Sequence, residues 1–111
     1  MKIRLKTKYC DGDAILHLGQ YTNGRLAIRC ISNGGIPILT ATVNLPEREL
    51  PADHIFLKSY AENEGLIECF IREKLVRRTY LEFAYNYVMI QEVKMADKLL
   101  NFIKTYELRD L

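Results

Sequence analysis

The sequence predicts an α+β fold in which an antiparallel meander sheet of about five to six strands is covered by two helices. Short runs of alternating apolar and polar residues, separated by Asn-Gly turns, indicate the strands. Two later segments with apolar residues at helical spacing indicate the helices. We expect a single domain over residues 1–111, with the sheet and first helix in 1–93 and an added C-terminal helix in 94–111.

The first strand is expected over residues 2–9. Ile3 and Leu5 lie on one side of this run, and basic side chains lie on the other, which is the two-residue period of a half-buried strand. Residues 11–13 are expected to break the strand. Ala14, Leu16 and Leu18 then share one face of a second strand.

Two glycine turns continue the meander. Asn23-Gly24 is expected to close a hairpin with a strand at 25–32, because a tight hairpin turn requires positive φ angles that Asn and Gly tolerate. Residues 33–35 repeat this arrangement before a strand at 36–44. Proline at both ends of residues 46–51 predicts an exposed loop, since proline lacks an amide donor.

The first helix is expected to follow a short extended segment at 54–58. Residues 59–62, Ser-Tyr-Ala-Glu, have the spacing of a capping box. Leu66, Ile67, Phe70 and Ile71 are then placed at helical spacing to cover one face of the sheet, and Glu68 is expected to pair with Arg72.

The last third returns to alternation and ends in a second helix. Residues 76–93 predict one long bent strand, or two strands with a turn near 84–86. Residues 96–108 predict a helix that packs on its own sheet or on another subunit. Phe83, Tyr85 and Tyr87 form a row that is expected to be core beneath this helix; the alternative is a platform that stacks nucleic-acid bases.

Three segments carry a resemblance to a known family. They are residues 21–28 with their Asn-Gly turn, residues 42–46 with Asn-Leu-Pro, and residues 56–66 with Glu-Asn-Glu-Gly. Together they resemble an uncharacterised bacterial family of unknown function that is carried largely on plasmids, conjugative elements and phages. The resemblance extends from Lys2 to about Val76 and implies a non-enzymatic accessory role, without an activity to transfer.

Composition and cysteine usage exclude several classes of protein. A chain of 111 residues with 49% apolar and 27% charged residues is too apolar for a disordered protein and too mixed for a membrane protein. Cys10, Cys30 and Cys69 are unpaired and widely spaced, so neither a disulfide nor a zinc site is expected. No cofactor is indicated. The charged N-terminus is unlike a signal peptide, which predicts a cytoplasmic protein.

Two charged surfaces are candidates for binding. The candidate basic surface could follow a phosphate backbone or meet an acidic protein, or could be a solvated strand face: Lys2, Arg4, Lys6, Lys8, Arg25 and Arg29. The candidate acidic surface could imitate DNA phosphates or could compensate the helix dipole: Glu47, Glu49, Glu62, Glu64 and Glu68. Asp53, His54 and Ser59 lie on one short segment, where a strand would point Asp53 and His54 to opposite faces, so they are not expected to form a catalytic triad.

These observations favour a small non-enzymatic accessory protein of a mobile genetic element that binds a host-encoded or element-encoded protein. Inhibition of host defence, of the anti-restriction or anti-CRISPR type, belongs to this hypothesis. The alternative is a nucleic-acid-binding module that uses the basic N-terminal strand, and an enzyme ranks third because no catalytic motif is present.

Overall fold

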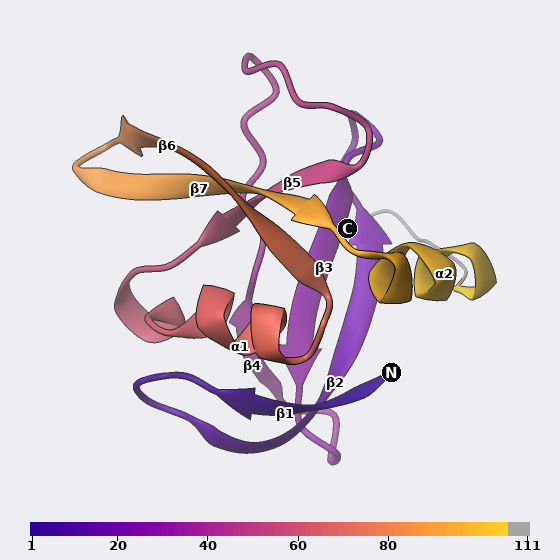
Figure 1. Ribbon diagram of the computed structural model, residues 1–111. Helices are drawn as coiled ribbons and strands as arrows, with labels where there is room; N and C mark the ends of the chain where they lie inside the picture. Colours follow the sequence, from indigo (N-terminus) through magenta and orange to yellow (C-terminus); the bar gives the residue numbers. More distant parts are fainter. Residues whose placement is uncertain (107–111) are drawn as a thin grey trace.

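Residues 1–106 of the protein are described by a computed structural model, in which two antiparallel sheets and two α-helices surround one main core (Figure 1). The first sheet has the strand order β1-β2-β3-β4 and the second has the order β5-β7-β6. The strands of the first sheet are β1 (Lys2–Lys6), β2 (Asp11–Gln20), β3 (Leu26–Ile31) and β4 (Pro37–Thr40). The second sheet contains β5 (His54–Lys58), β6 (Val76–Tyr85) and β7 (Val88–Met95), and the helices are α1 (Leu66–Arg72) and α2 (Asp97–Thr105).

The predicted α+β class, the antiparallel pairing and the two helices are confirmed. Within residues 1–106 the strands number seven and divide between two sheets, whereas the sequence predicted one sheet of about five to six strands. The predicted strand at 36–44 ends at Thr40, and beyond it a single bridge, Thr42 to Leu57, links the first sheet to the second. Residues 41–43 hydrogen-bond to β3 on one side and to β5 on the other, so the predicted strand continues as a link between the two sheets.

The first turn lies earlier than the sequence predicted. The amide of Thr7 donates to the carbonyl of Cys10 at 2.8 Å, so the chain reverses over residues 7–10. Residues 11–13, which were expected to break the strand, belong to β2 and pair with β1. The reason is electrostatic as well as geometric, because Asp11 and Asp13 lie opposite basic residues of β1.

The main core lies between the inner faces of the two sheets and α1. Ile3, Leu5, Leu16 and Leu18 are buried, as their alternation predicted. They meet buried residues of the second sheet and of α1 in one cluster, including Leu57, Val93, Leu66 and Phe70. Burial of an aliphatic or aromatic side chain of this size contributes about 1.5 to 3 kcal/mol each.

Helix α1 covers the free edge of β1, and its start differs from the predicted capping box. A 3₁₀ turn over Ala61–Asn63 comes first, and neither Ser59 nor any other side chain caps it. Buried Asn63 donates to the carbonyl of Thr40 at 2.8 Å, which fixes this turn against β4. α1 then begins after Gly65, whose φ of 93° favours glycine.

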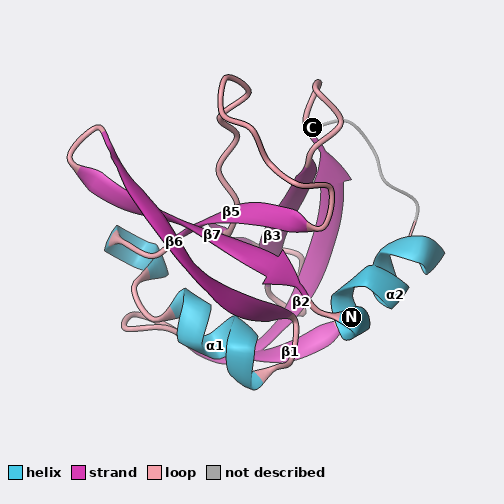
Figure 2. Cartoon of the chain, turned by 45° about the horizontal axis from the view of Figure 1, so that its top comes forward, coloured by secondary structure: helices cyan, strands magenta, loops and turns pink. Residues whose placement is uncertain are grey.

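The second sheet has a smaller core on its outer face. Leu45, from the loop that joins β4 to β5, is buried there together with Phe56 and Ile90. Phe83 lies at the edge of this cluster, with its ring 5.4 Å from that of Phe56. The prediction that Phe83, Tyr85 and Tyr87 lie beneath the C-terminal helix is therefore wrong, because α2 lies at the opposite end of β7 (Figure 2).

The C-terminal helix packs on its own chain. The predicted helix over residues 96–108 is observed as α2 over Asp97–Thr105, and positions 107–108 lie outside the described residues. Leu99 is fully buried, and Leu100, Phe102, Ile103 and Tyr106 pack against the main core. The apolar stripe predicted for this helix is confirmed.

Replacing Leu99 by alanine should lower the free energy of unfolding by about 2 to 5 kcal/mol, because it removes a fully buried side chain and leaves a cavity. Denaturant unfolding monitored by circular dichroism would measure this. The control, Lys104→Ala, changes an exposed residue of the same helix and should shift stability by less than about 0.5 kcal/mol. Equal stability of the two variants would contradict the placement of α2.

Candidate functional site

The basic face of β1 is largely neutralised within the structure. Lys2 pairs with Asp13 at 3.4 Å, Arg4 with Asp11 at 2.8 Å, and Lys8 with Glu64 at 3.4 Å. Among the candidate cations on this strand, Lys6 is exposed and has no ion pair within residues 1–106. These exposed pairs add little stability, but they reduce the positive charge that a phosphate backbone would meet.

Of the other two candidate cations, Arg25 is bound to the β4–β5 loop, whereas Arg29 shares the outer face of the first sheet with Lys2, two strands away. Arg25 donates through Nη1 to the carbonyl of Leu45 at 2.7 Å and through Nη2 to the carbonyl of Arg48. Its guanidinium therefore holds the β4–β5 loop. Arg29 lies opposite His17 across the strand pair, and its Nε is buried without a hydrogen-bond partner among the described residues.

The candidate acidic surface is split between two places. Glu47 and Glu49 are exposed on the β4–β5 loop, whereas Glu62, Glu64 and Glu68 lie at the 3₁₀ turn and α1, near the opposite end of the molecule (Figures 1 and 2). Glu68 pairs with Arg78 at 3.2 Å and not with Arg72 as predicted. This arrangement does not form one continuous acidic face.

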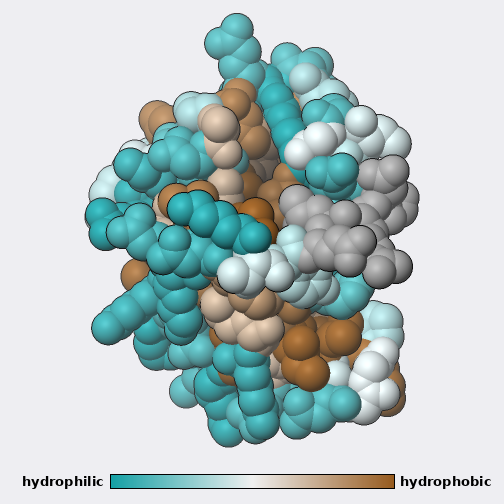
Figure 3. Space-filling view, turned by 90° about the vertical axis from the view of Figure 1, so that its right-hand side faces the viewer, coloured by the Kyte–Doolittle hydropathy of each residue, from teal (hydrophilic) through white to brown (hydrophobic). Residues whose placement is uncertain are grey.

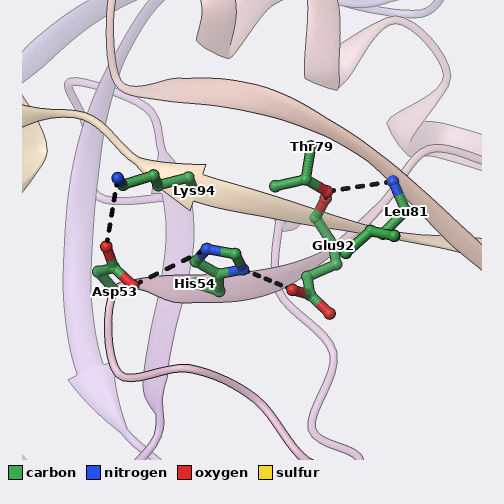
Figure 4. Close-up of polar contacts among 6 residues, drawn as sticks. All are labelled: Asp53, His54, Thr79, Leu81, Glu92 and Lys94. Carbon is green, nitrogen blue, oxygen red and sulfur yellow. Dashed lines mark hydrogen bonds and ion pairs between the residues drawn. The ribbon is translucent and has the colours of Figure 1, made fainter.

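A polar cluster around His54 joins the strands of the second sheet (Figure 4). His54 Nδ1 meets the Glu92 carboxylate, and His54 Nε2 lies 3.8 Å from Asp53, which also pairs with Lys94 at 3.7 Å. The Thr79 hydroxyl donates to the carbonyl oxygen of Glu92. These polar side chains are partnered within the cluster, and their contacts link β5, β6 and β7.

A hollow of about 380 Å³ lies beside α2. Its walls are mostly apolar side chains, among them Leu26, Leu50, Ile55, Met95, Leu100 and Ile103. Figure 3 shows this side of the molecule, where apolar atoms are interspersed with hydrophilic ones. The polar residues Arg25 and His54 at its rim are already bonded to other groups, which leaves few polar atoms to orient a ligand.

The most unusual surface is the β6–β7 hairpin, which extends past the core (Figures 1 and 2). Its large exposed apolar side chains are Tyr80, Leu81, Tyr85, Tyr87 and Met89. The remaining large apolar residues exposed within the described chain, Tyr9 and Ile36, stand alone elsewhere. A concentration of exposed aromatic and apolar side chains on one element is typical of an interaction surface.

Two tyrosines of this hairpin have an unfavourable backbone conformation. Asn86 and Tyr87 form the two-residue turn with φ of 48° and 68°, and the second position of such a turn strongly favours glycine. Tyr80 has φ of 63° at the irregularity between Arg78 and Leu81. Tyr80 is 87% exposed and Tyr87 is fully exposed, so neither side chain gains packing that offsets this cost of about 1 to 2 kcal/mol each.

The sequence identified the aromatic row but did not reveal its exposure. Tyr80, Leu81 and Met89 did not stand out as site residues, because alternation alone does not show where a strand extends past the core. Two signals were present: residues 79–91 contain one charged side chain, Glu82, and the turn has tyrosine in place of glycine.

The cysteines are free thiols in this fold. Burial raises the pKa of Cys30 to about 12 and also raises the pKa of Cys69, whereas Cys10 is partly exposed. Within residues 1–106, no group of three or more His, Cys, Asp and Glu side chains is arranged to hold a metal ion. The helices in this same range are too short or too polar to span a bilayer.

Comparison with known protein families, characterised proteins and solved structures gives no match for this chain.

Replacing Tyr87 by glycine should raise the free energy of unfolding by up to about 1 kcal/mol, because glycine adopts positive φ without strain and no packing is lost. Tyr80→Gly should behave similarly. Thermal or denaturant unfolding measures both. Tyr9→Gly is the matched control: Tyr9 is also exposed but lacks a positive φ, so it should gain nothing. A loss of stability in both hairpin variants would show that these tyrosine side chains already make stabilising contacts in the free chain.

A thiol reagent should label Cys10 first in the folded protein. Cys30 is buried and its raised pKa keeps it protonated at neutral pH, so it should react only on unfolding. Raising the pH toward the pKa of Cys30 favours its thiolate, but burial still limits access. Mass spectrometry of the labelled protein distinguishes the sites, and labelling of Cys30 at the same rate as Cys10 would show that the core opens readily.

Proposed function

We propose that this chain is a small non-enzymatic protein that acts by binding another protein through its β6–β7 hairpin. The observation that carries the proposal is the pair of exposed tyrosines at positive φ, Tyr80 and Tyr87. In the isolated chain, the backbone conformation of both residues costs stability while their side chains are largely exposed. A binding partner that buries their rings would supply the missing interaction.

The chemistry of the hairpin fits a protein partner. Tyrosine is enriched among residues that dominate binding energy, since its ring buries a large area and loses little conformational entropy. Tyr85, Leu81 and Met89 surround the two strained residues with further apolar area. The low charge of residues 79–91 matches the depletion of charged residues at interface centres.

The biological setting of this proposal rests on the sequence. The resemblance of residues 2–76 to a family carried on plasmids, conjugative elements and phages supports a cytoplasmic accessory protein of a mobile element. The partner is then a protein of the host or of the element. Inhibition of a host defence complex is the form of this activity that we propose, because it requires binding and no catalysis.

A nucleic-acid function is less well supported. The basic strand that would carry it has Lys2, Arg4 and Lys8 in ion pairs with carboxylates of the same chain. A net charge of +2 over the whole sequence adds little attraction for a polyanion. Binding to random oligonucleotides is expected to be no tighter than roughly micromolar at physiological salt.

Capture from a bacterial host lysate tests the proposal if three forms of the protein are compared. The unmodified protein and Tyr9→Gly should retain the same partner, and Tyr80→Gly with Tyr87→Gly should lose most of it, since hot-spot residues contribute about 2 kcal/mol or more each. Nuclease treatment should leave the capture unchanged. Retention of the partner by the double variant, or its loss on nuclease treatment, would contradict the proposal.

A further inference from the structure

Within residues 1–106, one edge of the second sheet is paired with another segment, and part of the other edge has no backbone partner. Its order places β5 and β6 at the two sides. The β5 edge is covered by residues 41–43: Val43 donates to the carbonyl of Phe56 at 3.1 Å, and Lys58 donates to the carbonyl of Ala41 at 3.0 Å. The first part of β6 lies beside α1, where Arg78 meets Glu68. The stretch from Leu81 to Tyr85 lies beyond that contact.

The hairpin geometry determines which backbone groups this open stretch presents. In a two-residue hairpin the residues flanking the turn, Tyr85 and Val88, exchange hydrogen bonds, and bonded pairs then alternate with non-bonded ones along the ladder. Glu82 and Ala84 occupy the non-bonded positions, opposite Gln91 and Met89. Their amide and carbonyl groups therefore point away from β7 toward the open edge.

The backbone groups at the β1 edge of the first sheet, by contrast, are hydrogen-bonded to side chains. The amide of Arg4 donates to Glu73 at 3.0 Å, and the amide of Lys6 and the carbonyl of Arg4 both meet the Cys69 thiol. Natural proteins also protect edges with lysine, proline or bulges. Residues 81–85 contain neither lysine nor proline, and the irregularity in β6 ends at Leu81.

We propose that the hairpin binds its partner by strand addition: an extended segment of the partner pairs antiparallel with β6 at Glu82 and Ala84. This rests on the proposed protein-binding function and specifies its mode. Tyr80 and Tyr87 are exposed at the two ends of the open stretch, next to the place where the added strand would lie. Main-chain hydrogen bonds supply affinity in this mode and alternate side chains supply specificity.

Charge specifies the chemistry of the added segment. Glu82 is the single charged side chain in residues 79–91, and its side chain shares a face with Ala84. A strand that places a lysine or arginine beside Glu82, with apolar residues next to Leu81 and Tyr85, complements this edge. The same hairpin of a second copy lacks such a cation, since Arg77 and Arg78 precede the irregularity and Arg78 already binds Glu68.

A synthetic peptide tests the mode directly on the intact protein. The probe is the capped heptapeptide Thr-Val-Lys-Val-Thr-Val-Thr, whose lysine shares a face with threonines while valines occupy the other face. At saturating peptide, the amides of Glu82 and Ala84 should exchange with solvent several-fold more slowly. The same peptide with glutamate in place of lysine should bind about twofold to fivefold more weakly, the range of an exposed ion pair.

Two variants separate the contribution of backbone hydrogen bonds to peptide binding from the contribution of the Glu82 charge. Ala84→Pro removes an amide that points to solvent, so it should leave the hairpin folded, as thermal melting will show, and should abolish peptide binding. Glu82→Lys should reverse the preference, so that the glutamate peptide binds more tightly than the lysine peptide. This reversal is independent of any loss of folding in the proline variant.

Several outcomes would overturn strand addition. One is an unchanged rate of amide exchange at Glu82 and Ala84 when peptide is added, and another is equal affinity for the two peptides. A third is slow exchange of these amides in the free protein together with a doubled mass in light scattering, which would assign the edge to a second copy. The natural partner separates this inference from the proposed function. A partner lost by Tyr87→Gly but kept by Ala84→Pro would preserve hairpin binding and reject strand pairing.

Discussion

Closure of the β1 edge by α1 is the interaction on which the arrangement of the two sheets depends. Cys69 projects from the helix so that its thiol accepts from the amide of Lys6 and donates to the carbonyl of Arg4, and burial raises its pKa so that the donating thiol form persists. The same helix buries Leu66 and Phe70 between the sheets. A short helix of seven residues would be marginal alone, and this packing is what stabilises it.

The approach to that helix imposes a second constraint. Gly65 has a φ of 93°, and a side chain there would lie 3.4 Å from the backbone of Thr7. The neighbouring amide of Lys8 donates to the carbonyl of Glu64 at 2.8 Å. The β1–β2 turn and the start of α1 are thus in contact through their backbones, which gives Glu-Asn-Glu-Gly a structural role here.

On the outer face of the second sheet, two arginine side chains hold a loop against the strands. The Arg48 guanidinium lies 3.4 Å from the centre of the Phe83 ring, and Arg25 holds the carbonyls of the loop that carries Arg48. A loop whose backbone is fixed in this way packs its own Leu45 with Phe56 and Ile90 without forming a strand. Coverage ends at Phe83, so the exposed side chains of the rest of the hairpin are open to a partner.

The sequence by itself determined the α+β class, the alternation of β1 and β2 and the apolar stripe of α2, because these depend on local periodicity and on backbone preferences. It also located the glycine turns, but Gly24 and Gly35 adopt positive φ without Asn23 and Asn33, and the β2–β3 turn extends over residues 21–25. It also contained the aromatic residues of the candidate site. Only the tertiary structure decided that Glu68 meets Arg78, that the basic strand is neutralised, and that Tyr80 and Tyr87 lie outside the core. These outcomes depend on how two sheets and a helix are placed relative to one another, and a residue pattern with a period of two is the same whether its strand lies beneath a helix or extends into solvent.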